Sequence, residues 1–252
     1  WTTKTETANR LRGRIEAVLS WATVSGYREG DNPARWRGNL SEVLPKPDKL
    51  AKVVHRPALA LADAAGWFTD LKTREGMGAR ALEYLAMTAA RSGEVRGATW
   101  DEIDVQAGLW TIPADRMKMS REHRVPLTAE ALALLEALPR LEGAHYIFAS
   151  ARGGQLSDMT VSAVMRRQGF VDARTGRTAV PHGIRSTFRD WAAERTEFPR
   201  DMAEISLAHQ VGSEVERAYR RGDMLEKRRG MMSAWGRFLR GEQDQKVVRL
   251  AQ

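Results

Sequence analysis

The 252-residue sequence contains no cysteine, which excludes disulfide bonds, thiolate zinc sites and a cysteine nucleophile. It also has no long apolar run. The longest stretch without Asp, Glu, Lys or Arg is the eleven residues from Ala17 to Tyr27, whereas a membrane-spanning helix needs about 20 apolar residues. The chain opens at Trp1 without an apolar secretion segment. We therefore predict a cytoplasmic protein with no membrane partner, cut from a longer chain.

The sequence also lacks the common motifs of metal and nucleotide sites. Its five histidines are dispersed, without a His-x-x-x-His pair or an Asp-x-Asp pattern. Its glycines form no phosphate-binding loop. We therefore predict no metal ion and no cofactor. A protein that handles phosphate without them must neutralise it with side chains, and Arg is suited to this because its guanidinium donates two parallel hydrogen bonds.

Basic residues exceed acidic residues by 40 to 32, which gives a net charge of +8. The excess lies in residues 1–50 and 151–252, and the middle of the chain is nearly neutral. A basic balance of this kind is typical of nucleic-acid-binding proteins, although an anionic surface or ordinary solubility would also explain it.

Lysine is scarce, and Lys118 is the only lysine between Lys72 and Lys227. A genome rich in G and C would produce such a bias without any functional reason. A lone lysine among many arginines nevertheless indicates chemistry that Arg cannot perform, because Lys can release its proton and Arg stays charged.

The chain divides into a small helical piece, a linker and a main domain. Thr3 and Glu6 have the form of a capping box, and they precede an apolar stripe that predicts a helix ending near Gly26. Residues 1–44 form the helical piece, and the proline-containing range 45–55 is the linker. The main domain covers 56–240, and 241–252 is a C-terminal tail.

The pattern of the main domain predicts a mainly α fold (α+β) with a small three-stranded antiparallel sheet. The expected strands are Thr99–Asp104, Leu109–Pro113 and His123–Leu127, with Tyr146–Ala149 as a further short strand. The expected helices are Pro57–Leu71, Ala79–Arg91, Thr128–Leu138, Ser157–Gln168, His182–Arg195, Asp201–Ala208, Glu214–Tyr219 and Asp223–Leu239.

Several residues could carry chemistry, and each alone also has an ordinary structural explanation. His182 and Arg185 share one face at the start of a helix, where an anion is favoured, but the pair is common. Arg91 is equally explained as a charge at a helix C-terminus. His209 follows an apolar run, and Tyr219 lies among arginines.

In chain order these positions resemble the active-site pattern of the tyrosine recombinases: Arg91, Lys118, His182, Arg185, His209 and Tyr219. The flanking stretches agree, including Ala90 to Gly97, Leu207-Ala208-His209 and Met231-Met232 with Trp235. In this detail the sequence is similar to the prophage and genomic-island integrases. The resemblance implies that 1–44 is part of a helical core-binding domain and that 56–240 is the catalytic domain.

The resemblance also implies a mechanism. Tyr219 attacks a DNA phosphate and forms a 3′-phosphotyrosyl bond, with His182 as base. Arg91, Arg185 and His209 stabilise the transition state, and Lys118 protonates the leaving 5′-oxygen. Glu94 positions Arg91. The covalent intermediate conserves the phosphodiester bond energy, so neither ATP nor a metal ion is needed.

The implied partner is double-stranded DNA at attachment sites, bound in the nucleoid of a bacterial cytoplasm. The expected assembly is a homotetramer on DNA and a monomer when free, with an accessory excision or DNA-bending factor. The resemblance implies that the tail 241–252 packs on a neighbouring subunit, whereas the sequence by itself is equally compatible with a disordered tail. Seven arginines are predicted to contact phosphates without reading sequence: Arg10, Arg12, Arg14, Arg28, Arg166, Arg167 and Arg189.

Two other functions remain open at this point. A type IB topoisomerase shares the arginine, lysine, histidine and tyrosine set but swivels DNA as a monomer, and the Leu-Ala-His and Met-Met stretches favour the integrase. A DNA-binding domain that does not cut would be expected if one catalytic position were lost, and all six are present.

Overall fold

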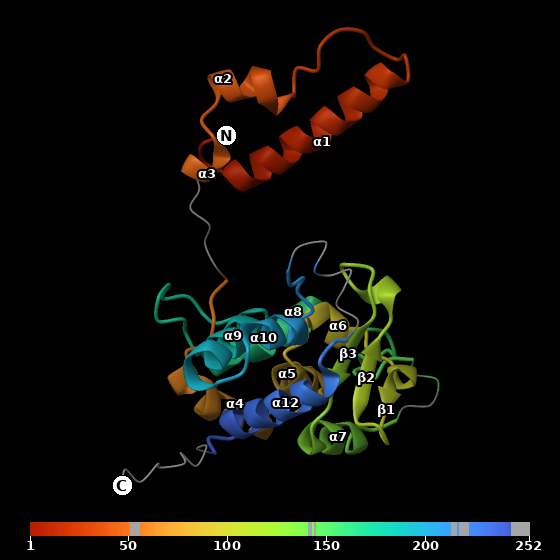
Figure 1. Ribbon diagram of the computed structural model, residues 1–252, viewed down its shortest axis with the longest axis vertical. Coiled ribbons are helices and arrows are strands. Elements are labelled where there is room, and N and C mark those ends of the chain that lie inside the picture. The colour runs from red at the N-terminus through yellow and green to blue at the C-terminus, as the bar shows by residue number, and fades with distance from the viewer. Residues whose placement is uncertain (51–55, 141–142, 144, 213–215, 217–221, 243–252) are drawn as a thin grey trace. The chain divides into compact units, whose positions relative to one another are not determined.

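The computed structural model describes residues 1–50, 56–140, 143, 145–212, 216 and 222–242 (Figure 1). The chain divides into two units, Trp1–His55 and Arg56–Gln252. Within the described ranges, every helix is too short or too polar to span a bilayer.

The first unit is built around one long helix. Its elements are α1 (Thr5–Val24), the irregular helical segment η1 (Trp36–Leu40), α2 (Ser41–Val43) and α3 (Pro47–Leu50). The side-chain amide of Asn32 donates to the Glu16 carbonyl and to the Ser20 hydroxyl, both at 2.8 Å. The rings of Trp1 and Trp36 stack with centroids 5.4 Å apart. These contacts hold the turn after α1 against the helix.

One expectation for this unit is wrong in detail. The helix α1 begins after Lys4 without a side-chain cap, so Thr3 and Glu6 do not form a capping box. The apolar stripe does form the predicted helix, and its side chains Leu11 and Val18 are 57% and 62% exposed. The range predicted as a linker contains α3, which contacts α1.

The second unit is mainly α with one small sheet, as predicted from the sequence. Its helices are α4 (Ala64–Thr73), α5 (Met77–Thr88), α6 (Ser92–Arg96), α7 (Ala129–Glu136), α8 (Asp158–Gln168), α9 (Gly183–Arg195), α10 (Arg200–Ser206) and α12 (Leu225–Leu239). Short 3₁₀ turns occupy η2 (Leu61–Asp63), η3 (Trp100–Glu102) and η4 (Ala114–Arg116). The helix α5 is buried over ten of its twelve residues and contacts α4, α6, α7, α8 and α12 (Figure 1).

The sheet has the order β1-β2-β3 and is antiparallel throughout, with β1 (Ile103–Asp104), β2 (Leu109–Ile112) and β3 (His123–Pro126). Trp110 and Ile112 alternate onto the buried face of β2, as the period of a strand requires. Ile112 pairs with His123, so the histidine begins its strand at the end of the hairpin loop.

An aromatic cluster joins the C-terminal helix to the rest of the core. Trp235 of α12 lies 5.2 Å from Trp191 and 5.3 Å from Phe188 of α9, measured between ring centroids. Its indole N–H donates to the Ala86 carbonyl of α5 at 2.7 Å. The methionine and tryptophan stretch in α12 therefore packs into the core of the second unit.

Several predicted boundaries are wrong. The start of the range Pro57–Leu71 is extended, because the Pro57 carbonyl accepts from Val180 and the Ala58 N–H donates to Asp172. The first strand is shortened to β1 because η3 replaces its beginning. The range Tyr146–Ala149 forms only isolated bridges, and Glu214–Tyr219 is not described as a helix because most of it lies outside the described residues.

Candidate active site

The C-terminal end of α10 is closed by two backbone hydrogen bonds that place His209. The Ala208 N–H donates to the Ile205 carbonyl, and the His209 N–H donates to the Glu204 carbonyl, both at 2.9 Å. This pairing is the Schellman pattern, which has a left-handed residue just after the helix. Ala208 supplies it with φ of 51°, a conformation that costs an L-residue about 1–2 kcal/mol.

Arg185, in the first turn of α9, is the buried centre of the site at 4% exposure. Its Nη1 donates to the Ala89 carbonyl at 2.6 Å, and its Nη2 donates to the Leu207 carbonyl. The same Nη2 lies 3.2 Å from His209 Nε2. Burial, and after it the charge of Arg91, lowers the pKa of Arg185 to about 10. The guanidinium is therefore still charged at neutral pH.

Arg91 lies between α5 and α6 and is held by Glu94. The prediction that Arg91 ends the preceding helix is wrong, because Ala89 is left-handed (φ 51°) and α5 stops at Thr88. The Glu94 carboxylate accepts the backbone N–H of Arg91 at 2.8 Å and its Nη1 at 2.6 Å. Glu94 is 5% exposed. One buried carboxylate thus fixes both the backbone and the guanidinium of Arg91.

The two arginines converge on one carbonyl oxygen. Arg91 Nη2 lies 3.5 Å from the Leu207 oxygen, to which Arg185 Nη2 also donates. It lies 3.4 Å from the Ala208 oxygen as well. The C-terminal ends of α5 and α10 carry partial negative charge, which helps to hold two cations that repel each other. The arrangement offers two adjacent guanidinium groups to an anion with several oxygens, such as a phosphodiester.

His182 precedes the first residue of α9 and is exposed. A Cβ atom on Gly183 would lie 2.1 Å from the Pro57 carbonyl oxygen and 2.8 Å from the Ala58 Cα. Glycine is therefore needed where the extended segment crosses the start of the helix. Partial burial, and then the charge of Arg185 and other arginines, lowers the pKa of His182. The imidazole is neutral at neutral pH and can accept a proton.

Lys118 lies in the turn between β2 and β3 and is exposed. Arg116, just before it, donates from Nη2 to the Glu94 carbonyl at 2.6 Å and forms an ion pair with Glu102. The hairpin is therefore tied to the segment that holds Arg91. Lys118 itself forms no hydrogen bond or ion pair with the described residues, so its ammonium group is available to a ligand.

Tyr219 lies outside the described residues. The described chain resumes at Gly222, and the next residue, Asp223, is held by two arginines. Arg124 of β3 donates to the Asp223 carboxylate at 2.7 Å and 3.0 Å, and Nη1 of the buried Arg228 lies 3.6 Å from it.

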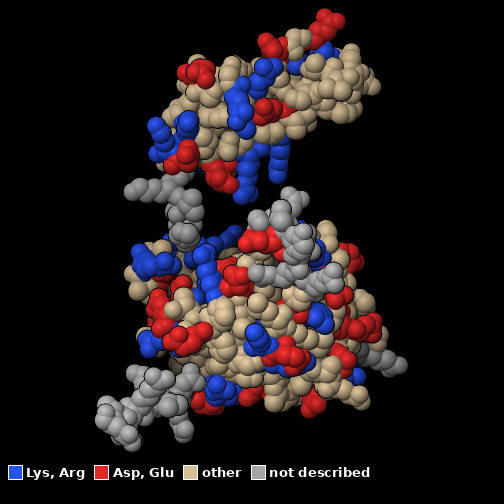
Figure 2. Space-filling view, in the orientation of Figure 1, with Lys and Arg blue, Asp and Glu red and all other residues tan. Residues whose placement is uncertain are grey.

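The seven arginines predicted to contact DNA fall into two groups. Arg14, Arg166 and Arg167 are exposed, and their side chains form no hydrogen bond or ion pair within the described ranges. The others bind neighbouring groups: Arg10 pairs with Glu6, Arg12 with Glu16, Arg28 donates to the Asp31 carbonyl, and Arg189 pairs with Glu204. Basic and acidic side chains are interspersed over the face drawn in Figure 2.

Two titratable residues beside the site were not predicted from the sequence. Glu204 contacts His209 through its carboxylate, at 2.6 Å from Nδ1. His123 is 9% exposed, and burial, followed by the charge of Arg228, lowers its pKa to about 4. The alternation along β3 indicates the burial of His123, but no sequence pattern indicates the contact of Glu204. Among the described residues, no group of three or more His, Asp or Glu side chains is arranged to hold a metal ion.

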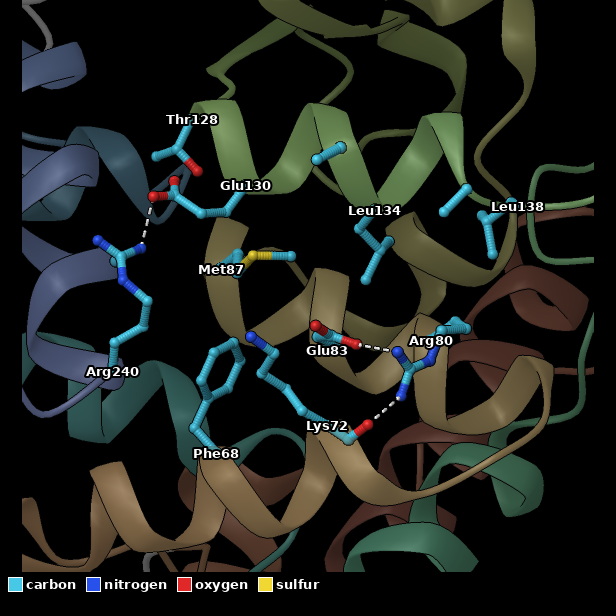
Figure 3. A pocket seen from close by; sticks show the side chains of 13 residues that line it. Phe68, Lys72, Arg80, Glu83, Met87, Thr128, Glu130, Leu134, Leu138 and Arg240 are labelled. Carbon is cyan, nitrogen blue, oxygen red and sulfur yellow. Dashed lines mark hydrogen bonds and ion pairs between the residues drawn. The ribbon is translucent and has the colours of Figure 1, made fainter.

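Two pockets differ in their relation to this site. One of about 300 Å³ is lined by His209, His123, Asp223 and Arg228, so it borders the site. Another, of about 340 Å³, lies between α4, α5, α7 and α12 (Figure 3). Its wall includes the ion pair of Glu130 with Arg240, at 2.7 Å, and none of the predicted catalytic residues.

The chain shares its fold with integrases of known structure. A lambda integrase tetramer bound to a Holliday junction matches with a TM-score of 0.59 and 20% identity, over 84% of this chain and 61% of that one. The integrase of mycobacterium phage Brujita matches with a TM-score of 0.55 and 20% identity, over 96% of this chain and 78% of that one. The fold is thus that of the integrase class.

Sequence comparison places the chain within that class. The phage integrase family model matches residues 69–226, and the phage integrase central domain model matches residues 1–39. The prophage integrase IntA of Escherichia coli K12 is 34% identical over 96% of this chain and 57% of its own length. The integrase of enterobacteria phage P4 is 30% identical over 94% of this chain and 55% of its own length.

The chain belongs to the phage integrase family. The resemblance noted in the sequence is therefore confirmed, and so is the predicted fold class. The chain spans little more than half the length of the two curated relatives.

Proposed function

We propose that this chain is the catalytic domain, with part of the core-binding domain, of a site-specific DNA recombinase that integrates and excises a prophage or genomic island. The observation that carries the proposal is the convergence of Arg91 and Arg185 on the Leu207 carbonyl, next to His209. Two guanidinium groups and an imidazole at one point match what a phosphodiester in a pentacoordinate transition state requires.

In this proposal Tyr219 Oη attacks the phosphorus and the P–O5′ bond breaks, which leaves a 3′-phosphotyrosyl bond and a free 5′-hydroxyl. The phenol proton passes to His182, whose lowered pKa keeps it neutral and able to accept. The 5′-oxygen takes its proton from Lys118. Arg91 and Arg185 bind the non-bridging oxygens, and Glu94 keeps Arg91 in place.

The partner is double-stranded DNA at attachment sites, in the cytoplasm and nucleoid of a bacterium. We propose a homotetramer on DNA and a monomer when free, with an accessory excision or DNA-bending factor. Solved structures with the same fold include a lambda integrase dimer bound to a core site and a lambda integrase tetramer bound to a Holliday junction. They support a DNA partner and an oligomer.

A covalent trap tests the chemistry. The chain is incubated in EDTA with nicked duplexes taken from the flanks of its own gene, and a denaturing gel is used to look for a protein–DNA adduct. We expect an adduct whose linkage maps to Tyr219 by peptide mass spectrometry, and none with Tyr219→Phe. Tyr27→Phe changes an exposed tyrosine of the first unit and is the matched control.

Binding without any adduct would contradict the proposal and favour a DNA-binding domain that does not cut. Reciprocal exchange of strands between two attachment-site duplexes indicates a recombinase, whereas relaxation of supercoiled DNA without exchange indicates a topoisomerase.

A further inference from the structure

The side chain of Glu204, in the last turn of α10, is 13% exposed and points at His209. Its Oε2 lies 2.6 Å from His209 Nδ1, while its own backbone carbonyl accepts the His209 N–H at 2.9 Å. One residue therefore holds both the backbone and the ring of His209. The left-handed turn at Ala208 makes this possible, because it folds the chain back over the end of the helix.

The two ring nitrogens of His209 have different partners, and these assign the proton. An ionised carboxylate only accepts hydrogen bonds, so Nδ1 must carry a hydrogen. Arg185 Nη2 only donates, and it lies 3.2 Å from Nε2, so Nε2 offers its lone pair. These two partners fit the Nδ1–H tautomer of His209, with Nε2 directed at the arginines that would bind phosphate.

A second arginine of α9 completes the arrangement. Arg189 Nε forms an ion pair with Glu204 Oε1 at 2.8 Å. Arg185 and Arg189 are one turn apart on the same helix face. The helix α9 therefore fixes His209 at Nε2 through Arg185 and fixes its carboxylate partner through Arg189. Rotation of the imidazole away from the site would break contacts at both ends.

We propose that Glu204 is the positioning residue for His209 in phosphoryl transfer, an inference that rests on the proposed function. Glu204 keeps the hydrogen on Nδ1 and aims Nε2 at the phosphate. When DNA binds, Nε2 takes up a proton from solvent water and donates it as a hydrogen bond to a phosphate oxygen, and the Glu204 carboxylate stabilises the imidazolium that forms. The orienting carboxylate of a catalytic histidine acts in the same way in other enzymes.

The first test compares Glu204→Ala and Glu204→Gln with the full chain in single-turnover adduct formation at saturating DNA. We expect the rate to fall about tenfold to a hundredfold with Glu204→Ala, while DNA affinity stays unchanged. Glu204→Gln keeps an acceptor for Nδ1 but loses the charge, and we expect an intermediate rate. Glu130→Gln is the matched control, since it breaks another Arg–Glu pair.

A double-mutant cycle separates positioning from a general loss of structure. In a His209→Ala background the further change Glu204→Gln should have almost no effect on the rate. An equal loss with and without His209 would show that Glu204 acts independently and would overturn the proposal.

The second test reads His209 directly and needs no DNA. NMR spectra are recorded on the full chain with ¹⁵N-labelled histidine, and the His209 signals are assigned by their absence in the His209→Ala variant. We expect the ¹⁵N chemical shifts of His209 to show a protonated Nδ1 and an unprotonated Nε2. Glu204→Ala should shift His209 to a mixture of tautomers. If His209 has the Nε2–H form, or if its spectrum is the same in the full chain and in Glu204→Ala, the positioning role fails even where adducts form. If the spectrum responds but no chain forms an adduct, the proposed function fails instead.

Discussion

Ala89 and Ala208 are each left-handed and each follow a helix that ends at the site. The Ala89 carbonyl accepts from Arg185, and the Ala208 carbonyl lies 3.4 Å from Arg91 Nη2. Backbone strain of this kind persists where the surrounding contacts determine it, and it concentrates at functional sites. The strain here turns two carbonyl groups toward the pair of arginines.

His123 makes stability depend on pH. Its pKa is about 4 in the folded protein because it is buried, against about 6.5 when unfolded. Between these values the unfolded chain binds a proton that the folded chain does not, so stability falls as pH falls. We expect the free energy of unfolding to drop by about 2–3 kcal/mol from this group between about pH 7.5 and pH 4.5.

Urea unfolding at both pH values measures this loss, with His123→Gln as the reference. The variant lacks the titrating group and should lose less stability on acidification than the wild-type chain. If the difference in free energy of unfolding between the wild-type chain and His123→Gln does not change with pH, His123 is not the group that makes stability depend on pH.

At the scale of elements, the start of α9 depends on Gly183. Replacing it with alanine places a Cβ atom 2.1 Å from the Pro57 carbonyl oxygen, so the extended segment or the helix must move. We expect Gly183→Ala to lower the free energy of unfolding by about 1–3 kcal/mol and to slow adduct formation, because His182 and Arg185 move with the helix. Chemical denaturation and the covalent trap measure the two effects.

Gly230→Ala is the control for this change. Gly230 lies in α12, and nothing is within 4 Å of its added Cβ. We expect a gain of about 0.5–1 kcal/mol, because alanine favours a helix over glycine. Equal changes in the free energy of unfolding for Gly183→Ala and Gly230→Ala would show that the contact between Gly183 and the Pro57 carbonyl is not tight.

Helices and strands with a clear hydrophobic period were predictable from the sequence. Segments whose conformation depends on contacts with residues distant in the sequence were not. The helix α8 begins at Asp158, one residue after its predicted start, and the Ser157 hydroxyl accepts from the Thr160 N–H. The extended start of the second unit depends on Asp172, far away in the sequence. The end of α5 at Thr88 depends on a left-handed alanine, and alanine is the strongest helix former, so local sequence argues for the opposite.

The candidate site, like the fold, was predictable from the sequence only in part. Five of its six predicted positions are described, and Arg91, Arg185 and His209 are brought together. Their order along the chain was recognised only through the resemblance, since no local pattern distinguishes them from ordinary charged residues. Glu204 was missed because its contact with His209 depends on the turn at Ala208.

At the scale of the whole molecule, the excess of basic charge should appear in the salt dependence of DNA binding. Arg14 is exposed and forms no hydrogen bond or ion pair with the described residues. As a phosphate contact, Arg14→Ala should weaken binding to attachment-site and random duplexes alike and reduce the slope of log K against log salt by about 1. Fluorescence anisotropy over a series of salt concentrations measures the DNA affinity and the slope.

Arg12→Ala provides the contrast. Arg12 donates to the Ala34 carbonyl at 3.0 Å, pairs with Glu16 and lies over the Trp36 ring. Its loss should destabilise the first unit as well as change binding. An unchanged slope for Arg14→Ala would remove that residue from the DNA interface.

The carbonyl oxygen that Arg91 and Arg185 share has a thermodynamic consequence. In the free protein one neutral acceptor serves two cations that repel each other. A phosphodiester seated between them would exchange this repulsion for two attractions, and a ligand that binds only the folded state adds its binding free energy to stability. Under the proposed function, folding and DNA binding are therefore linked equilibria, and we expect DNA to stabilise the second unit against unfolding.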